Sequence, residues 1–211
     1  MSAGRRRFIL FLFILAALFF TLSALLQGAA HRRLPFSCAA ECRPLSLFVR
    51  EERLPAGRKH TLPPLQNGDI LLTTCTHSFG WRHGHAALVV DSRTGTTLEA
   101  VTPGTPSSLG RVPDWETYPS LTVLRLKHAD KEIGQAVADF AQETLLGLPY
   151  CLTSGWGRSK SPSPPTGSQC AYLVWYAYFQ FGYDLDSDGG KLVTVADLAA
   201  SPLLETVFQS G

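Results

Sequence analysis

The chain has 211 residues, of which 45% are hydrophobic and 17% charged, a composition that suits one folded domain with a leader. Its formal net charge is +2, but residues 1–30 hold three arginines and no acidic residue. The rest of the chain keeps 16 of the 19 basic residues against 17 acidic ones, a net charge of −1. This balance argues against a nucleic-acid-binding surface, so no nucleic-acid partner is expected.

The N-terminus has the pattern of an export signal. Three arginines at positions 5–7 precede an apolar run over residues 8–26, and small residues follow at 28–30. The run is 19 residues long, which is enough to cross a bilayer as a helix. Cleavage after Ala30 and retention as a membrane anchor are therefore both open. Either way, the arginines stay inside, and the remainder is expected to be extracytoplasmic, with the membrane touched only through residues 8–26.

The cysteine count is odd, which matters in an oxidising compartment. At least one of five thiols stays free or pairs between chains. Two disulfides that leave Cys170 reduced would suit a catalytic thiol, but the pairing does not follow from the sequence. The five are Cys38, Cys42, Cys75, Cys151 and Cys170.

The middle of the chain alternates short strand patterns with turns. Residues 31–61 mix Arg, Pro and Cys without periodicity, and we interpret them as a tether or a peripheral cover. A folded unit is predicted over residues 62–211. Apolar, β-branched runs predict strands at 68–74, 85–91, 96–101 and 121–126, with a hairpin turn at 92–95 and loops at 75–82 and 102–119.

Helix signals dominate the second half. Asp130 is placed to cap a helix that runs to about Leu146 and ends at Gly147. A capping-box pattern at Thr194 to Asp197 predicts a short last helix. The segment from Gly155 to Gly167 is rich in Pro, Ser and Gly, and it leads directly into a third helical pattern.

This third pattern begins at Cys170. Apolar residues recur at the spacing of one helix face, which places the thiol in the first turn. Unpaired N–H groups and the helix dipole favour a thiolate there, so Cys170 is either a nucleophile or a small core residue. The residues of this face are Cys170, Leu173, Val174, Ala177, Tyr178 and Phe181.

A cysteine nucleophile needs a base, and the base needs an orienting acceptor. His85 starts the predicted second strand, and Glu99 lies in the strand across the hairpin turn. If these strands pair, both side chains lie at the end of the hairpin away from the turn. Each residue also has a non-catalytic interpretation. His85 could be a histidine of the core or its rim, and Glu99 could be a solvated carboxylate of the hairpin. Gln169 reads as a residue beside the helix cap, and Tyr150 as a packing residue.

A zinc site is an alternative use of the same histidine. Cys75, His77, His83 and His85 lie within eleven residues, and thiolates and imidazoles bind zinc. Their spacing matches none of the compact zinc patterns. We therefore expect no metal and no other cofactor.

Six segments, in this order, resemble the permuted papain-like hydrolases of the NlpC-related superfamily, and among them the bacterial amidase-like branch of the YiiX/YaeF type. The resemblance runs from about Leu65 to Val207 and implies an α+β fold in which a small antiparallel sheet or half-barrel packs against the cysteine helix. By position it implies a general base at His85, its orienter at Glu99 and the nucleophile at Cys170. The segments are NGDILLTT, GHAALVVD, TLEAV, GLPY, SQCAYLVWYAY and TVADLAASPLLETV.

The function implied is a thiol-dependent amidase or peptidase that cleaves a cell-wall peptide or related substrate through an acyl-enzyme on Cys170. Two alternatives remain. One is a lipid acyl hydrolase or acyltransferase, as in lecithin:retinol acyltransferase-like relatives, with an acyl groove lined by tryptophans. The other is a non-catalytic envelope-binding domain of the same fold. The tryptophans are Trp81, Trp115, Trp156 and Trp175.

Overall fold

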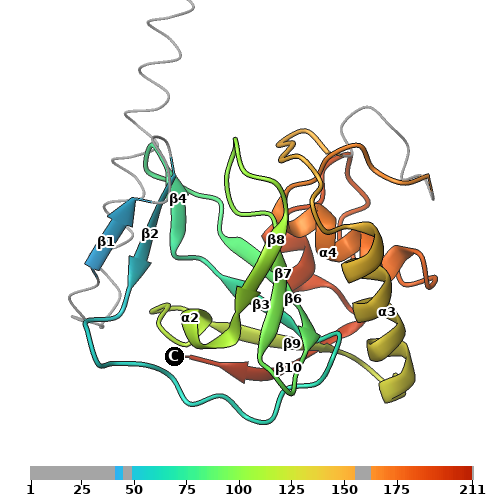
Figure 1. The fold of residues 1–211 in the computed structure, drawn as a ribbon, viewed down its shortest axis with the longest axis horizontal. Helices are drawn as coiled ribbons and strands as arrows, with labels where there is room; N and C mark the ends of the chain where they lie inside the picture. The colour runs from blue at the N-terminus through green and yellow to red at the C-terminus, as the bar shows by residue number, and fades with distance from the viewer. Residues whose placement is uncertain (1–40, 45–48, 155–162, 211) are drawn as a thin grey trace, which may run out of the picture.

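The computed structural model describes residues 41–44, 49–154 and 163–210 (Figure 1). The predicted signal or anchor at residues 1–30 lies outside this part of the chain, as do Cys38 and most of the proline-rich segment before Cys170. In the described ranges no helix has both the length and the apolar character needed to span a bilayer.

The centre of the molecule is a six-stranded antiparallel sheet. Its strand order shows that neighbours in sequence are not always neighbours in space, because β3 pairs with both β6 and β9. The predicted hairpin is present, with β6 and β7 joined around the turn at 92–95. In spatial order the strands are β10 (Leu204–Gln209), β9 (Thr122–Leu126), β3 (Ile70–Thr73), β6 (His85–Asp91), β7 (Thr96–Glu99) and β8 (Ser108–Arg111).

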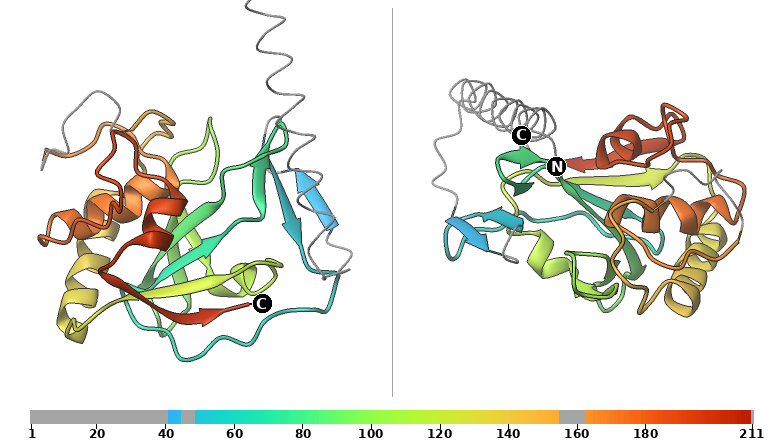
Figure 2. Two further views of the ribbon diagram at one scale, coloured as in Figure 1. Left: turned by 180° about the vertical axis from the view of Figure 1, so that it is seen from behind. Right: turned by 90° about the horizontal axis from the view of Figure 1, so that it is seen from above.

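A second, smaller sheet lies at one end of the molecule, and the longer helices lie at the other (Figures 1 and 2). The small sheet has the order β1 (Glu41–Pro44), β2 (Val49–Arg53), β4 (Thr76–Ser78) and β5 (Trp81–Arg82). Both β1 and β2 come from the segment predicted as a tether, and β2 pairs with β4 of the domain. That interpretation stays a prediction, but part of the segment contributes to the fold.

Three helices cover one face of the large sheet. Helix α4 (Cys170–Phe179) packs on β6, and α3 (Lys131–Thr144) packs on β6 and on α4. The short α5 (Val195–Ala200) lies against α4 and begins with the predicted capping box of Thr194 and Asp197. A one-turn helix, α2 (Val112–Trp115), follows β8 on the opposite face (Figure 2).

Strand periodicity divides the core into two clusters. Successive side chains of a strand point to opposite faces, so β6 sends Ala86 and Leu88 toward the helices and Ala87 and Val89 toward α2. The same alternation explains why these strands are apolar throughout: both of their faces are buried, as the continuous apolar runs predicted. His85 and Ala87 are two residues apart, so His85 belongs to the α2 face.

Two predictions of local structure were wrong, and one strand was not predicted. Residues 76–82, expected as a loop, form the β4–β5 hairpin, and residues 108–115, also expected as a loop, form β8 and α2. The strand without a prediction is β10, at residues 204–209. β4 pairs with β2 and β10 pairs with β9, and such contacts between separate segments leave no local pattern.

The cysteine helix also differs from its predicted form. Residues 171–178 are all buried, so α4 is surrounded by protein and has no solvent face. The predicted apolar stripe is part of this buried surface, and Tyr172, Trp175 and Tyr176 fill the other side. A helix that is apolar all round is typical of a central position in the core.

A close approach between α3 and the turn before β3 gives a first prediction. A Cβ at Gly134 would lie 2.2 Å from the backbone oxygen of Asn67. Helix propensity alone would favour Gly134→Ala by about 1 kcal/mol. We expect the opposite: a loss of about 2 kcal/mol from overpacking and a fall in Tm of roughly 4–8 °C in thermal unfolding.

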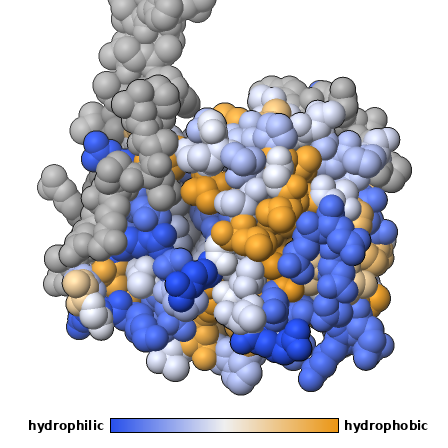
Figure 3. Space-filling view, in the orientation of Figure 1, coloured by the Kyte–Doolittle hydropathy of each residue, from blue (hydrophilic) through white to orange (hydrophobic). Residues whose placement is uncertain are grey.

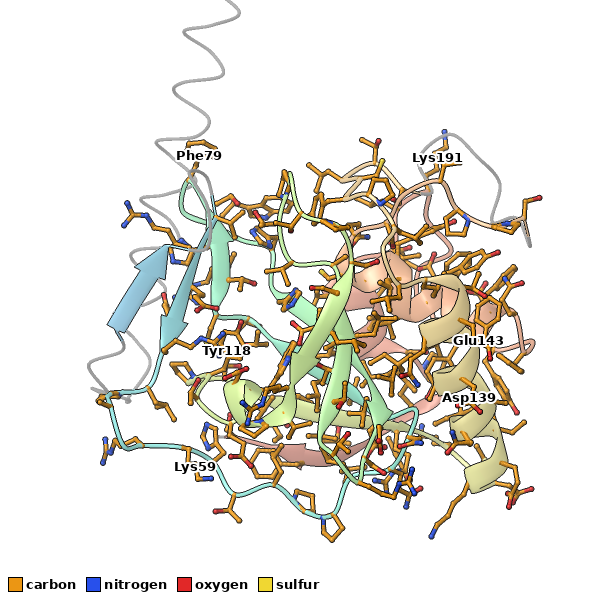
Figure 4. All side chains as sticks on the ribbon, in the orientation of Figure 1. Lys59, Phe79, Tyr118, Asp139, Glu143 and Lys191 are labelled. Atoms are coloured by element: carbon orange, nitrogen blue, oxygen red, sulfur yellow. The ribbon has the colours of Figure 1, made fainter. Side chains whose placement is uncertain are left out.

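The control for this prediction is Glu143→Ala on the exposed side of the same helix (Figure 4), which should leave Tm within about 2 °C. A Gly134→Ala protein as stable as the wild type would contradict this prediction, because it would show that the backbone at Asn67 can move away from the added Cβ without a loss of stability.

Candidate active site

His85 and Glu99 meet at the open end of the β6–β7 hairpin, as predicted. His85 is the first residue of β6 and Glu99 the last of β7, and Nε2 of His85 lies 2.9 Å from Oε2 of Glu99. Both residues are buried, with 3% and 9% of their surface exposed. Gly84 allows this start of the strand: its φ is +73°, and a Cβ there would lie 2.7 Å from the oxygen of Thr73.

Cys170 completes the cluster from the other side of the sheet. It is the first residue of α4, and its side chain is close enough to His85 to contribute to the raised pKa of the imidazole. Nε2 of His85 contacts Glu99, which leaves Nδ1 as the ring nitrogen for the thiol. Cys170 and His85 can approach each other because His85 is the first residue of β6 and Cys170 is the first residue of α4. The imidazole lies at the end of the strand, where the sheet does not separate it from the helix. The structure thus brings together all three predicted site residues.

The electrostatics of the cluster favour a protonated imidazole. Burial by itself lowers the pKa of His85, but the hydrogen bonds and negative charges of Cys170 and Glu99 outweigh burial and raise this pKa to about 10. For Glu99, burial acts to raise the pKa, and the hydrogen bond and charge of His85 outweigh it, so the pKa is lowered. An imidazolium paired with the Glu99 carboxylate therefore describes the site near neutral pH.

Two further residues hold Glu99, and the sequence analysis assigned neither to the site. Oε1 of Glu99 accepts hydrogen bonds from Thr97 Oγ1 at 2.5 Å and from Trp115 Nε1 at 2.9 Å. The period of two in β7 could have indicated Thr97, which points to the same face as Glu99. Trp115 has no comparable local signal, because α2 reaches Glu99 only through the fold.

The helix start is fixed by Gln169, which is the N-cap residue itself. Its Oε1 accepts a hydrogen bond from the Ala171 N–H at 2.8 Å, and its Nε2 donates to the oxygen of Val193 at 2.6 Å. Both ends of the amide are thus committed to structure. Backbone N–H groups of a helix's first turn lack intrahelical partners. The N–H of Cys170 is therefore available in principle to stabilise an oxyanion.

The segment before Cys170 pairs with the connection that follows α3. Tyr150 and Ser168 form a parallel β-bridge, and the Cys151 N–H donates to the oxygen of Ser168 at 2.8 Å. Burial, followed by the charge of Cys170, raises the pKa of Tyr150, which places its ring near the thiol. Tyr150, which the sequence indicated as a packing residue, can therefore pack beside the site.

The four residues of the zinc alternative have separate partners. Cys75 is buried in the α2-side core and accepts a hydrogen bond from the Ser120 N–H at 3.3 Å. His83 contacts the oxygen of Gly84 and the hydroxyl of Ser78. His77 lies 3.9 Å from Glu52, and His85 belongs to the cluster with Glu99. These contacts do not gather the four side chains around one point.

Cys75, Cys151 and Cys170 are free thiols, so Cys151 and Cys170 are not joined by a disulfide.

The four tryptophans of the acyl-groove alternative differ in their exposure to solvent. Trp115 and Trp175 are fully buried, Trp81 is 57% exposed, and Trp156 lies outside the described residues.

Comparison with known proteins identifies the fold. No protein family matches the sequence, and no curated protein does. Among solved structures, the crystal structure of the metalloprotein yiiX from Escherichia coli O157:H7, described as DUF1105, matches with a TM-score of 0.52 at 18% identity. The match covers 69% of this chain and 98% of that chain. At this identity the match shows the fold, and it confirms the resemblance to the YiiX type at that level.

The ion pair gives a prediction that alkylation can test. Iodoacetate is an anion and is attracted by an imidazolium beside the thiolate, whereas neutral iodoacetamide is not. The ratio of their rates at Cys170 should therefore stay high up to about pH 10 and fall as His85 loses its proton. In Glu99→Gln the imidazolium loses its anionic partner, so the fall should move to lower pH by at least one unit.

Mass spectrometry of the Cys170 peptide measures both rates without interference from Cys75 and Cys151. A ratio that is independent of pH in the wild type would contradict the ion pair. Thr97→Val is the matched control, since it removes one hydrogen bond from an uncharged donor to Glu99 and leaves the charge of that carboxylate in place; its shift should be smaller.

Proposed function

We propose that this chain, which has the fold of yiiX, is a cysteine hydrolase that cleaves an amide bond through an acyl-enzyme on Cys170. The observation that carries the proposal is the Cys170–His85–Glu99 cluster, in which a half-buried thiol at a helix start contacts an imidazole held by a buried carboxylate. A structural core cysteine would not need a protonated, hydrogen-bonded partner. The order of base, orienter and nucleophile along the chain supports a permuted papain-like arrangement.

The chemistry proceeds in two steps. The thiolate of Cys170 attacks the carbonyl carbon, a C–S bond forms, and the carbonyl oxygen becomes an oxyanion near the helix N-terminus. The C–N bond then breaks, and the proton of His85 goes to the leaving amine. Water attacks the resulting thioester with His85 as general base, which releases the acid and restores the thiol. Glu99 holds the imidazole in orientation and stabilises its charged form.

The substrate class proposed is a cell-wall peptide or a related amide. It rests on the extracytoplasmic location expected from residues 1–30 and on the NlpC-related resemblance. The exported part is nearly neutral, so we assign no role to long-range charge attraction.

Because yiiX is described as a metalloprotein, the described residues of this chain were searched for a metal site. In the described residues one group of three possible ligands lies within 4.8 Å, formed by Asp186, Asp188 and Asp197. Oxygen ligands of this kind suit Ca²⁺ or Mg²⁺. However, Oδ2 of Asp197 holds the Thr194 cap of α5 and Oδ1 accepts from Ser187. The Asp197 carboxylate is thus already used by the cap and by Ser187, so the group has a structural role without a metal, and the proposed reaction uses no metal.

The lipid acyl alternative has some surface support. Leu146 and Leu152 flank the segment that leads to Tyr150, and they are 45% and 61% exposed. Leu109 of β8 is 50% exposed, and Figure 3 shows apolar surface in the middle of this face. Such side chains could contact an acyl chain, whereas a cell-wall peptide needs polar partners. The acyl group found on Cys170 would separate the two substrates.

The test of the proposed function is thiol reactivity. In the wild type, iodoacetamide should label Cys170 near neutral pH much faster than Cys75 or Cys151. In His85→Ala the rate at Cys170 should fall by about 100-fold, because the imidazolium no longer stabilises the thiolate. An activated ester such as p-nitrophenyl acetate should leave an acetyl group on Cys170, which mass spectrometry detects.

His60→Ala is the matched control, because the ring of His60 contacts the backbone oxygen of Tyr118 and the ring of Phe208, and neither of these groups belongs to the cluster. It should leave the rate unchanged. Labelling of Cys170 no faster than that of an unperturbed thiol would refute the hydrolase and leave a non-catalytic domain.

A further inference from the structure

The side chain of Trp115 contacts both His85 and Glu99. Its ring stacks on the imidazole of His85, with centroids 5.2 Å apart and planes 15° from parallel. Its Nε1–H donates to Oε1 of Glu99 at 2.9 Å. Trp115 is 1% exposed, so neither contact competes with water.

The two contacts act on different degrees of freedom. The stacked indole covers one face of the imidazole and fixes the plane in which its two nitrogens lie. The indole N–H, with Thr97 Oγ1, occupies Oε1 of Glu99 and leaves Oε2 for His85. Hydrogen bonds to a carboxylate also stabilise its charged form, which in turn favours the imidazolium.

Trp115 is connected to the small sheet through Tyr118. Tyr118 packs edge-on against Trp115, with centroids 5.2 Å apart at 62°. The hydroxyl of Tyr118 donates to Oε2 of Glu51 at 2.9 Å, and the guanidinium of Arg53 lies 3.5 Å above the Tyr118 ring. Figure 4 shows Tyr118 between β2 and α2.

This connection to β2 is a buried ionic one. Glu51 is 6% exposed, and its Oε2 also accepts from Arg53 at 2.6 Å. Loss of one member of such a group would leave an uncompensated buried charge, which favours keeping Glu51, Arg53 and Tyr118 together. β2 is in turn paired with β4, which precedes His85 by only a few residues.

We propose that Trp115 is a positioning residue for the His85–Glu99 pair and that strand β2 holds it in place through Tyr118 and Glu51. The N-terminal segment predicted as a tether is then an integral part of the site. The inference rests on the proposed function, because it takes Cys170 and His85 as the reacting groups.

A tryptophan in this core would fill volume in any case, so the test needs a readout that packing alone does not move. The pH at which His85 loses its proton is such a readout. The titratable groups that face this region are Cys170 from α4, Glu99 from β7, His83 from the β4–β5 hairpin and its neighbouring turn, and Tyr118 and Glu51 beyond Trp115. All of them are unchanged in sequence in Trp115→Phe.

The experiment measures the ratio of iodoacetate to iodoacetamide rates at Cys170 against pH in the full chain. In Trp115→Phe the fall of the ratio should move to lower pH by about one unit, because the carboxylate loses a charge-assisted hydrogen bond. The matched control is Trp175→Phe. Trp175 is also fully buried and donates its Nε1–H to a carboxylate, Oδ1 of Asp184 at 2.8 Å, but it lies in the helix-side core.

Trp175→Phe should lower Tm as much as Trp115→Phe does and leave the pH of the fall unchanged. A folded Trp115→Phe protein with the wild-type pH dependence would overturn the inference. Tyr118→Phe tests the connection to β2 and serves where Trp115→Phe does not fold: a smaller shift in the same direction supports the connection, and no shift overturns it.

The labelling rates distinguish failure of the proposed hydrolase function from failure of the positioning role of Trp115. If Cys170 of the wild type is not labelled faster than Cys75 and Cys151, the hydrolase itself is refuted. If it is labelled fast and Trp115→Phe behaves as the wild type, the hydrolase stands and the positioning role does not.

Discussion

The buried contact between His85 and Glu99 is the constraint on which the arrangement of the site depends. A carboxylate and an imidazole removed from water are costly unless each is paired and its remaining atoms are hydrogen-bonded. Here Glu99 has three donors on its two oxygens, and His85 has Glu99 on one nitrogen and Cys170 facing the other. The first residue of β6 and the last residue of β7 must therefore lie side by side, and the cysteine helix must begin next to them.

This constraint explains why the large sheet is covered on both faces. The helices on one side supply the thiol, since α4 is enclosed by β6, α3 and α5 and its first residue emerges at the end of β6. The other side supplies the support for the imidazole, since α2 places an indole over it. A half-buried sheet with one solvent face could not supply both. The small sheet extends the support, because Glu51 of β2 holds Tyr118 against Trp115.

The dipole of the cysteine helix contributes less to the electrostatics at Cys170 than the charge of His85 does. A helix N-terminus stabilises an anion by about 0.3–1 kcal/mol at exposed sites. The imidazolium beside Cys170 is a full charge in a buried place, and its pKa of about 10 reflects strong pairing. The helix start matters more for geometry: Gln169 uses both ends of its amide to fix the first turn, which holds the thiol at the strand end.

The sequence by itself determined the parts of this protein that rest on local periodicity. It located the β6–β7 hairpin, β3, β9 and the three longer helices, and it placed His85, Glu99 and Cys170 on elements that could meet. It could not determine β8, β10, the small sheet or Trp115, because the pairing of these strands and the packing of Trp115 on His85 depend on contacts that leave no periodic trace. The tertiary structure alone decided that α4 is buried on every side and that Glu99 is held by an indole N–H. It decided both because burial and hydrogen-bond geometry depend on what lies across the fold, and the neighbours along the chain do not specify that.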